Sequence, residues 1–138
     1  MSFTQIELDY LAGQRLGRLA TKRPDGTLQN NPVGFRYQPD TATIDVGGFT
    51  MAASRKFRNV ADNGEVAFVI DDLPSISPWR VRCLEIRGTA EAIENPTDSA
   101  YGSGEPIIRI HPRRILSFGL DQPDSEPHDL VPNIRNVN

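Results

Sequence analysis

The spacing of hydrophobic and polar residues predicts a mainly β chain with two short helices. Thr4 and Glu7 have the spacing of a helix capping box, and Gly13 supplies a stop for a brief opening helix. Alternating segments bounded by turns that contain Pro, Asp or Gly then predict strands over residues 15–21, 28–37 and 42–46. Because the connections are tight, we expect these strands to form an antiparallel meander.

The second half of the chain predicts one internal helix and further strands. Residues 52–63 have a narrow apolar face that includes Phe57 and Val60, and Gly64 offers a left-handed stop. The apolar run within residues 65–70 has strand length, and its continuity predicts a strand covered on both faces. The remaining expected strands span 79–93, 107–110 and 115–120, with a loop over 94–105 and an interruption at His111 and Pro112.

The order of these elements indicates the fold class. Six or seven strands, one inserted helix and no alternation of strands with helices predict a small antiparallel β-barrel, which excludes a Rossmann dinucleotide site. We expect residues 1–120 to form a single domain. Residues 121–138 form an acidic tail that contains prolines and few apolar residues, so we expect it to be disordered or to exchange with another chain.

Charge and hydropathy exclude several classes of partner. The net charge of −3 comes entirely from the acidic tail, so the first 120 residues carry no basic excess that would suit nucleic acid. No apolar run approaches the ~20 residues of a membrane span, and the N-terminus lacks the pattern of a signal peptide. We therefore expect a cytoplasmic protein that binds neither nucleic acid nor a membrane.

The residues most often used in metal sites and catalysis show no pattern. Cys83 is the single cysteine, so no disulfide forms within one chain, and His111 and His128 are too far apart in sequence to suggest metal ligands. We expect no metal site. No Ser/His/Asp set or pair of carboxylates is visible either, and the catalytic residue is left unassigned.

Three cations at the start of the internal helix are the most informative feature. Arg55, Lys56 and Arg58 lie where the partial positive charge of a helix N-terminus favours Asp or Glu. Such a cluster predicts an anion-binding site, because helix N–H groups and cations would act together on one negative group. The alternative is a solvated helix face whose cations pair with residues such as Asp62.

The order of several motifs resembles that of a known family. The segments are the hairpin RLATKRPDGTLQNNPVGF, the strand end IDVGG, the helix SRKFRNVADNGEVAFVIDD, the strand RCLEIRGTAEAI and the closing IRIHPRRILSFGL. Together, over about residues 4–120, they resemble the flavin/deazaflavin oxidoreductases, which share the FMN-binding split β-barrel of the pyridoxamine 5′-phosphate oxidases. The sequence is most similar to the actinobacterial branch that uses the deazaflavin F420. The resemblance implies a homodimer with two cofactor sites at the subunit interface.

The resemblance also implies roles for individual residues. Arg55, Lys56 and Asn59 match the positions that hold the cofactor phosphate in the family. The segments that pass along the ring system match Pro32, Val33, Gly47, Gly48, Phe49 and Thr50. Two glycines in a strand can equally mark a bulge or a tight bend.

The resemblance extends to the segment around the only tryptophan. Trp79 matches an aromatic that family members often lay over the cofactor of the other subunit, although a core or dimer-packing role is an alternative. Arg80 and Arg82 face either the acidic tail of the cofactor or solvent along an exposed strand face.

The implied activity is a hydride transfer. F420 in its reduced form delivers hydride from C5 to an electron-poor double bond, so the family implies an F420-dependent reductase acting on an unsaturated or conjugated small molecule. Two alternatives stay open at this point. One is an FMN-dependent oxidoreductase of the pyridoxamine-phosphate-oxidase type, and the other is a non-catalytic protein that binds flavin or F420.

Overall fold

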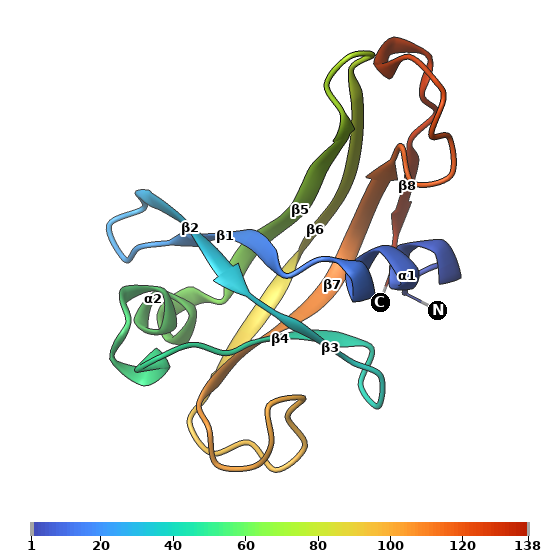
Figure 1. Ribbon diagram of the computed structural model, residues 1–138. Coiled ribbons are helices and arrows are strands. Elements are labelled where there is room, and N and C mark those ends of the chain that lie inside the picture. Colours follow the sequence, from blue (N-terminus) through green and yellow to red (C-terminus); the bar gives the residue numbers. More distant parts are fainter. Residues whose placement is uncertain (1, 138) are drawn as a thin grey trace.

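The structure, a computed structural model, describes residues 2–137 as a curved antiparallel sheet with two α-helices (Figure 1). The helices are α1 (Gln5–Gly13) and α2 (Arg55–Asn63), and short 3-10 turns η1 (Met51–Ala53) and η2 (Pro127–Asp129) precede α2 and β8. The strands are β1 (Leu16–Lys22), β2 (Leu28–Gly34), β3 (Arg36–Gln38), β4 (Thr43–Val46), β5 (Glu65–Ser75), β6 (Arg80–Ile93), β7 (Ile107–Phe118) and β8 (Asn133–Asn136).

The sheet curls far enough to bring its two edges together. Strand order runs β2-β1-β5-β6-β7-β4-β3, and β8 pairs with β7 beside this path. The first and last strands in that order, β2 and β3, are consecutive in the chain and are separated only by Phe35. Since one residue spans at most about 3.6 Å, the two edges must lie close together, as they do in a barrel. The predicted antiparallel barrel is confirmed.

The break at Phe35 corrects the prediction of one strand over residues 28–37. On one side of the break β2 pairs with β1, and on the other side β3 pairs with β4. The chain therefore changes partners at the point where it passes from one edge of the sheet to the other. Phe35 is buried there and packs edge-to-face on Phe68, with 5.5 Å between the ring centroids.

The core lies inside the curl of the sheet. Alternate residues of β5, namely Val66, Phe68 and Ile70, are buried in it, whereas Ala67 and Val69 between them are partly exposed on the outer face. The prediction of a strand covered on both faces is therefore wrong for the single chain. A continuous apolar run here serves a core face and an outer sheet face that no helix covers (Figure 1).

The opening helix begins at the predicted capping box. The Glu7 backbone N–H donates to Thr4 Oγ1 at 3.2 Å, and the Thr4 N–H donates to Glu7 Oε1 at 3.0 Å. The helix ends at Gly13, as its sequence predicts. Glu7 is fully buried and also contacts β7 and β8, so α1 is attached to the sheet through the same carboxylate that caps it.

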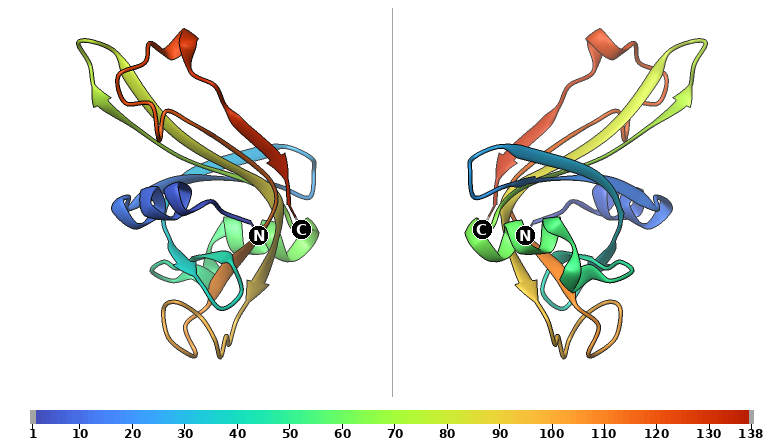
Figure 2. Two further views of the ribbon diagram at one scale, coloured as in Figure 1. Left: turned by 90° about the vertical axis from the view of Figure 1, so that its right-hand side faces the viewer. Right: turned by 90° about the vertical axis from the view of Figure 1, so that its left-hand side faces the viewer.

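Part of the tail forms a strand within the chain, where its composition predicts disorder or exchange. Residues 133–136 form β8, which pairs antiparallel with β7 of the same chain. Arg135 points inward from β8 and donates to both Glu7 oxygens and to the Ser2 carbonyl, with donor–acceptor distances of 2.5–3.0 Å. This buried ion pair supplies an interaction that the polar composition of residues 121–138 does not reveal. The N- and C-terminal segments consequently lie side by side (Figure 2).

The two expected closing strands are one continuous strand, β7, in which His111 and Pro112 do not interrupt the pairing. The register between β6 and β7 instead shifts at Arg87 and Gly88. Proline cannot donate a ladder hydrogen bond, and an irregularity of this kind is where a sheet tolerates it. A bulge therefore replaces the predicted break.

The hairpin of β5 and β6 extends well beyond the barrel (Figure 1). At its base, Arg82 donates to both oxygens of Asp72 at 2.9 and 2.5 Å, and the Tyr10 hydroxyl donates to the same carboxylate at 2.8 Å. These contacts tie the hairpin to α1. We call residues 72–82 the hairpin arm.

Candidate functional site

The cationic segment lies at the start of α2, which begins at Arg55 rather than at the predicted residue 52, because residues 51–53 form η1 and Ser54 is the cap. Ser54 caps the helix by accepting a hydrogen bond from the Phe57 N–H at 3.2 Å, and Gly64 ends it with a left-handed φ of 71°. Phe57 and Val60 are buried toward the barrel, and this orientation leaves Arg55 and Arg58 exposed and Lys56 half-buried.

The three cations of α2 have no acidic partner. Within residues 2–137, neither Arg55, Lys56 nor Arg58 makes an ion pair or a side-chain hydrogen bond, and Asp62 is not bonded to any of them. By contrast, Arg18, Arg82, Arg87, Arg109 and Arg135 each pair with a carboxylate of the chain. The alternative of a face whose cations are paired with Asp62 is therefore not observed, and the positive charge at this helix end is uncompensated.

The turn that leads from β4 into α2 carries an unusual aromatic residue. Phe49 is 99% exposed, and Thr50 beside it adopts a left-handed φ of 54°. Threonine is β-branched and rarely takes this conformation, which costs on the order of 1–3 kcal/mol. Gly48 is exposed and Gly47 half-buried. Phe49 thus has no cover within residues 2–137, in the turn that precedes the three cations along the chain.

The structure places Asn59 behind the cations rather than among them. Its side chain is fully buried, and Nδ2 donates to Thr21 Oγ1 at 3.0 Å and to Gln29 Oε1 at 3.2 Å. Both amide hydrogens are therefore used to join α2 to β1 and β2, and Oδ1 has no hydrogen-bond partner in the described chain. An amide in this state has no donor left for a phosphate.

Pro32 and Val33 cannot both face one ligand, because neighbouring residues of a strand point to opposite sides of the sheet. Val33 is buried in the barrel core. Pro32 is exposed on the outer face, in register with Arg18 of β1. Of this pair, only Pro32 is accessible.

Trp79 lies at the far end of the hairpin arm, where it is 50% exposed. The two arginines that follow it are paired within the chain. Arg80 lies 3.4 Å from Glu126 of the tail, and Arg82 binds Asp72. Their charges are compensated, so neither is as available to an acidic ligand as the cations of α2.

A buried ion cluster, which the sequence reasoning missed, anchors the loop between β6 and β7. Arg109 donates to both oxygens of Asp45 at 2.9 and 3.1 Å and to Asp98 of the loop at 3.0 Å. Asp45 is fully buried and also accepts from the Ala100 N–H at 2.9 Å. These contacts raise the pKa of Arg109, chiefly through the hydrogen bonds that it donates to Asp45. The available signal was a single charged residue inside each of two apolar strands, TIDV and IIRI.

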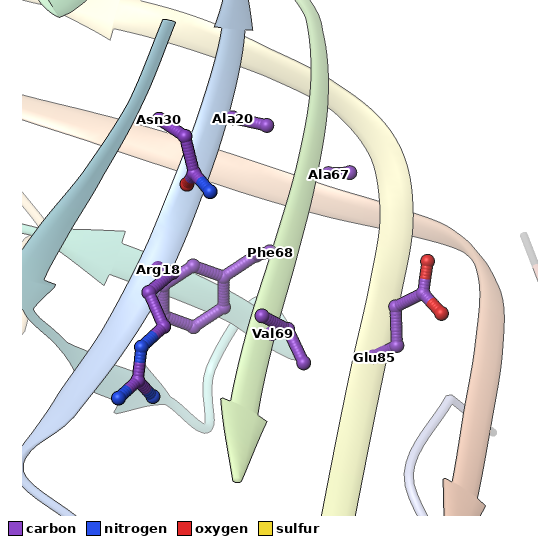
Figure 3. Close-up of a pocket in the computed structure, with 7 residues that line it drawn as sticks. All are labelled: Arg18, Ala20, Asn30, Ala67, Phe68, Val69 and Glu85. Carbon is purple, nitrogen blue, oxygen red and sulfur yellow. The ribbon is translucent and has the colours of Figure 1, made fainter.

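The outer face of the sheet carries a shallow hollow of about 300 Å³ (Figure 3). The lining residues are Arg18, Ala20, Asn30, Ala67, Phe68, Val69 and Glu85. The Phe68 side chain is buried in the core, so Ala20, Ala67 and Val69 supply the apolar side chains on the outer face, beside the polar and charged ones. Arg18 is paired with Asp71 at 2.6 Å and Glu85 with Arg87 at 2.7 Å. This outer face, formed by β2, β1, β5 and β6, therefore combines uncovered apolar surface with charges that are already neutralised.

The described residues hold neither a metal-ligand cluster nor a membrane-spanning helix. In residues 2–137 no three His, Cys, Asp or Glu side chains come together as a metal site would require. None of the helices described there has the length and apolar character needed to cross a membrane.

Comparison with known proteins places the fold and sequence in context. The family model described as pyridoxamine 5′-phosphate oxidase matches residues 5–130. A 5a,11a-dehydrotetracycline/5a,11a-dehydrooxytetracycline reductase from Streptomyces rimosus is 46% identical over 124 residues, which cover 88% of this chain and 86% of the relative. Both names describe redox enzymes.

Solved structures agree on the architecture. A conserved hypothetical protein from Mycobacterium tuberculosis has a TM-score of 0.66 at 18% identity, covering 90% of this chain and 89% of the other. A protein described as an F420 reductase has a TM-score of 0.59 at 26% identity, covering 78% of this chain and 93% of the other. The barrel is thus of the split type that the motifs predict, and the chain belongs to the pyridoxamine 5′-phosphate oxidase family.

Proposed function

We propose that this protein is an F420-dependent oxidoreductase that reduces an unsaturated or conjugated small molecule. One observation carries the proposal: three cations without acidic partners stand at the start of α2, next to an uncovered aromatic turn. A phosphate-bearing cofactor with a planar ring matches both features. The reductase named in Streptomyces rimosus and the F420 reductase among the structural neighbours support the choice of reaction and cofactor.

Different residues of the site would contact different parts of such a cofactor. Arg55 and Lys56 would bind the phosphate together with free N–H groups of the α2 N-terminus, as charge-assisted hydrogen bonds. The turn at residues 47–50 would lie along the ring, where the two glycines let the backbone approach closely. Asn59 would act indirectly, by holding α2 against β1 and β2.

The bound deazaflavin supplies the hydride, and the chain supplies position, charge and exclusion of water. Arg55 and Lys56 fix one end of the cofactor, so the ring end would be held at the turn of residues 47–50. A second subunit would complete the enclosure. We include in the proposal a homodimer in which the outer sheet faces pack together and each hairpin arm brings Trp79 toward the partner's site, and a cytoplasmic location.

FMN is the alternative cofactor. The matched family model is named for pyridoxamine 5′-phosphate oxidase, and FMN also has a terminal phosphate and a planar ring. The same cations would bind either phosphate. The choice between F420 and FMN therefore depends on the ring and on the groups other than the phosphate. A direct comparison of the binding of the two cofactors decides it.

The test is a pair of titrations on the purified full-length protein. F420 is added while its fluorescence is followed, and FMN is added while its absorbance and fluorescence are followed. We expect F420 to bind with a micromolar or lower dissociation constant and FMN to bind at least tenfold more weakly. Tighter binding of FMN would establish the alternative, and binding of neither would reject the proposed function.

Two substitutions test the phosphate site. Replacing Arg55 and Lys56 together by Ala should weaken F420 binding by about 2–4 kcal/mol, because two charge-assisted hydrogen bonds are lost. Arg113→Ala is the matched control, since Arg113 is an exposed arginine of β7 whose carbonyl accepts from the Val137 N–H and whose side chain makes no hydrogen bond or ion pair within residues 2–137. Circular dichroism should show an unchanged fold in both variants. Unchanged affinity in the Arg55/Lys56 variant would remove these residues from the site.

A further inference from the structure

The loop of residues 94–106 brings one side chain onto the turn that is proposed to carry the cofactor ring. Tyr101 lies against Gly47, at the end of β4. A Cβ atom built on Gly47 would stand 2.8 Å from Tyr101 Cζ and 2.9 Å from Cε1, which is closer than real carbon atoms approach. The phenol ring therefore occupies the space that a side chain at position 47 would fill, and a larger residue there would have to displace the ring.

The ring of Tyr101 is held from a second direction as well. The Arg36 guanidinium lies over its face, 4.7 Å from the ring centroid, at a distance typical of a cation–π contact. Burial raises the pKa of Tyr101, and the hydrogen bond of the Gly47 backbone opposes the rise. The hydroxyl therefore keeps its proton near neutral pH and is able to donate it in a hydrogen bond.

The buried ion cluster fixes the segment from which Tyr101 projects. Asp98 and Ala100 are both bonded to the cluster of Arg109 and Asp45, and the Gln38 side chain donates to the Asp98 carbonyl. Tyr101 follows directly, and its N–H donates to Ser99 Oγ at 2.9 Å. A loop whose role was only to connect two strands would not need a fully buried carboxylate on β4 to hold it.

Resting on the proposed function, we infer that Tyr101 forms a wall of the cofactor-ring site at residues 47–50, with its hydroxyl placed to donate a hydrogen bond to the ring or to the substrate beside it. Asp45, Arg109 and Asp98 are positioning residues for Tyr101. The assignment gives the site a polar group that the sequence does not indicate. The need to place the Tyr101 ring also explains both the small residue at position 47 and the buried ion cluster that holds the loop.

The chain contains three tyrosines, which allows a test that does not depend on activity. Protein labelled with 3-fluorotyrosine should give three 19F signals, assigned by the variants Tyr10→Phe, Tyr37→Phe and Tyr101→Phe. On titration with F420, and separately with FMN, the Tyr101 signal should shift and saturate with the dissociation constant found by fluorescence. The Tyr10 signal should stay in place, because its hydroxyl is engaged with Asp72 at the base of the hairpin arm.

The outcomes separate this inference from the proposed function. If a cofactor binds by fluorescence while the Tyr101 signal does not move, the inference is wrong and the proposed function stands. If neither cofactor binds, both are rejected. If the Tyr101 signal alone shifts and saturates with the cofactor, the wall assignment is supported.

Three variants test the hydroxyl and its support. Tyr101→Phe keeps the packing on Gly47 and should weaken cofactor or substrate binding about 3- to 10-fold, the loss expected for one neutral hydrogen bond, while Tyr37→Phe should not. Asp98→Asn removes a half-exposed partner of Arg109 and should move the Tyr101 19F signal in the free protein. Gly47→Ala should move it further, since the methyl group displaces the ring. A Tyr101 signal that is the same in all these free proteins would overturn the positioning role.

Discussion

Glu7 is the residue on which the two ends of the chain converge. It is fully buried, accepts from Ser117 Oγ at 2.6 Å, and forms an ion pair with Arg135 at 2.5 Å. Burial acts to raise its pKa, but the hydrogen bonds from Arg135, Ser117 and Thr4 prevail, and the pKa lies below the ordinary 4.5. A buried carboxylate that stays ionised in this way depends on its partners.

The first prediction concerns Glu7→Gln. The substitution should lower the free energy of unfolding at pH 7 by about 1.5–3 kcal/mol, because the amide replaces charge-assisted hydrogen bonds and leaves Arg135 without a counter-charge. Because the folded-state pKa is below the unfolded one, this contribution is fully present above about pH 4.5 and is lost as the pH falls through the folded pKa. Urea unfolding at a series of pH values from 7 to 3 measures both effects.

The matched control is Glu94→Gln, at an exposed position in the loop between β6 and β7. It should leave the free energy of unfolding within about 0.5 kcal/mol of the parent value, as is usual on the surface. If Glu7→Gln and the parent protein lost stability in parallel between pH 5 and pH 3, Glu7 would not be the group responsible.

At the scale of elements, the pairing of β6 with β7 is the longest in the sheet, and it passes through one bulge. Gly88 sits at this bulge, where an added Cβ would overlap the carbonyl oxygen of His111. The obstacle is backbone on the neighbouring strand, which has no alternative rotamer to adopt. The bulge therefore fixes a glycine at this position through close approach of two strands.

The second prediction is that Gly88→Ala destabilises the protein by about 1–3 kcal/mol, the usual cost of overpacking. Gly13→Ala is its control, since nothing lies within 4 Å of the Cβ position there and Gly13 ends α1 without a left-handed φ. That variant should be equally stable or up to about 1 kcal/mol more stable. Thermal unfolding of the two variants and the parent gives the comparison, and equal midpoints would contradict the bulge argument.

Some helices, turns and strands could be predicted from their own local sequence, and others could not. The capping box, the α2 helix with its glycine stop and the tight turns depend on local interactions, and the structure has them as predicted. The split of 28–37, the continuous β7 and the pairing of β8 depend on partners distant in sequence. Local patterns carry no information on which strand lies beside them, so these three features could not be derived.

The residues of the candidate site also divide into those set by local sequence and those set by distant partners. The cations of α2 were found because their charge conflicts with a local rule on helix ends. The contact of Tyr101 with Gly47 was missed. It depends on the register of β4 against β7 and on the ion pair that joins Asp45 of β4 to Arg109 of β7. Asn59 was placed with the phosphate by its position in a motif, whereas its actual bonds are to β1 and β2.

At the scale of the whole molecule, the outer sheet face of β2, β1, β5 and β6 carries apolar side chains that no element of residues 2–137 covers. Leu28 is 77% exposed and Leu16 57%, and their positions in β2 and β1 place both on this face. Its charges are paired with one another at the surface, which lowers the cost of covering them. A second copy of the chain would bury this apolar area.

The third prediction follows from this arrangement. Val69→Lys places a charge in the centre of the outer face and should raise the dimer dissociation constant by about tenfold or more, since the charge would be buried without a partner. Ala61→Lys, on the exposed side of α2, is the control. Size-exclusion chromatography with light scattering measures the mass of each. A parent protein that is monomeric at high micromolar concentration would refute the dimer.

The contact of Arg135 with Ser2 and Glu7 brings residue 2 beside β8, so we expect the fold to tolerate a circular permutation. A gene rearranged so that a short Gly/Ser linker joins the present ends, with new ends opened in the exposed turn of residues 24–26, should encode a protein of the same architecture. Such a permuted protein should bind its cofactor with unchanged affinity, since the new ends lie in a turn outside the proposed site. It would offer a way to attach labels without disturbing the contacts among Ser2, Glu7 and Arg135.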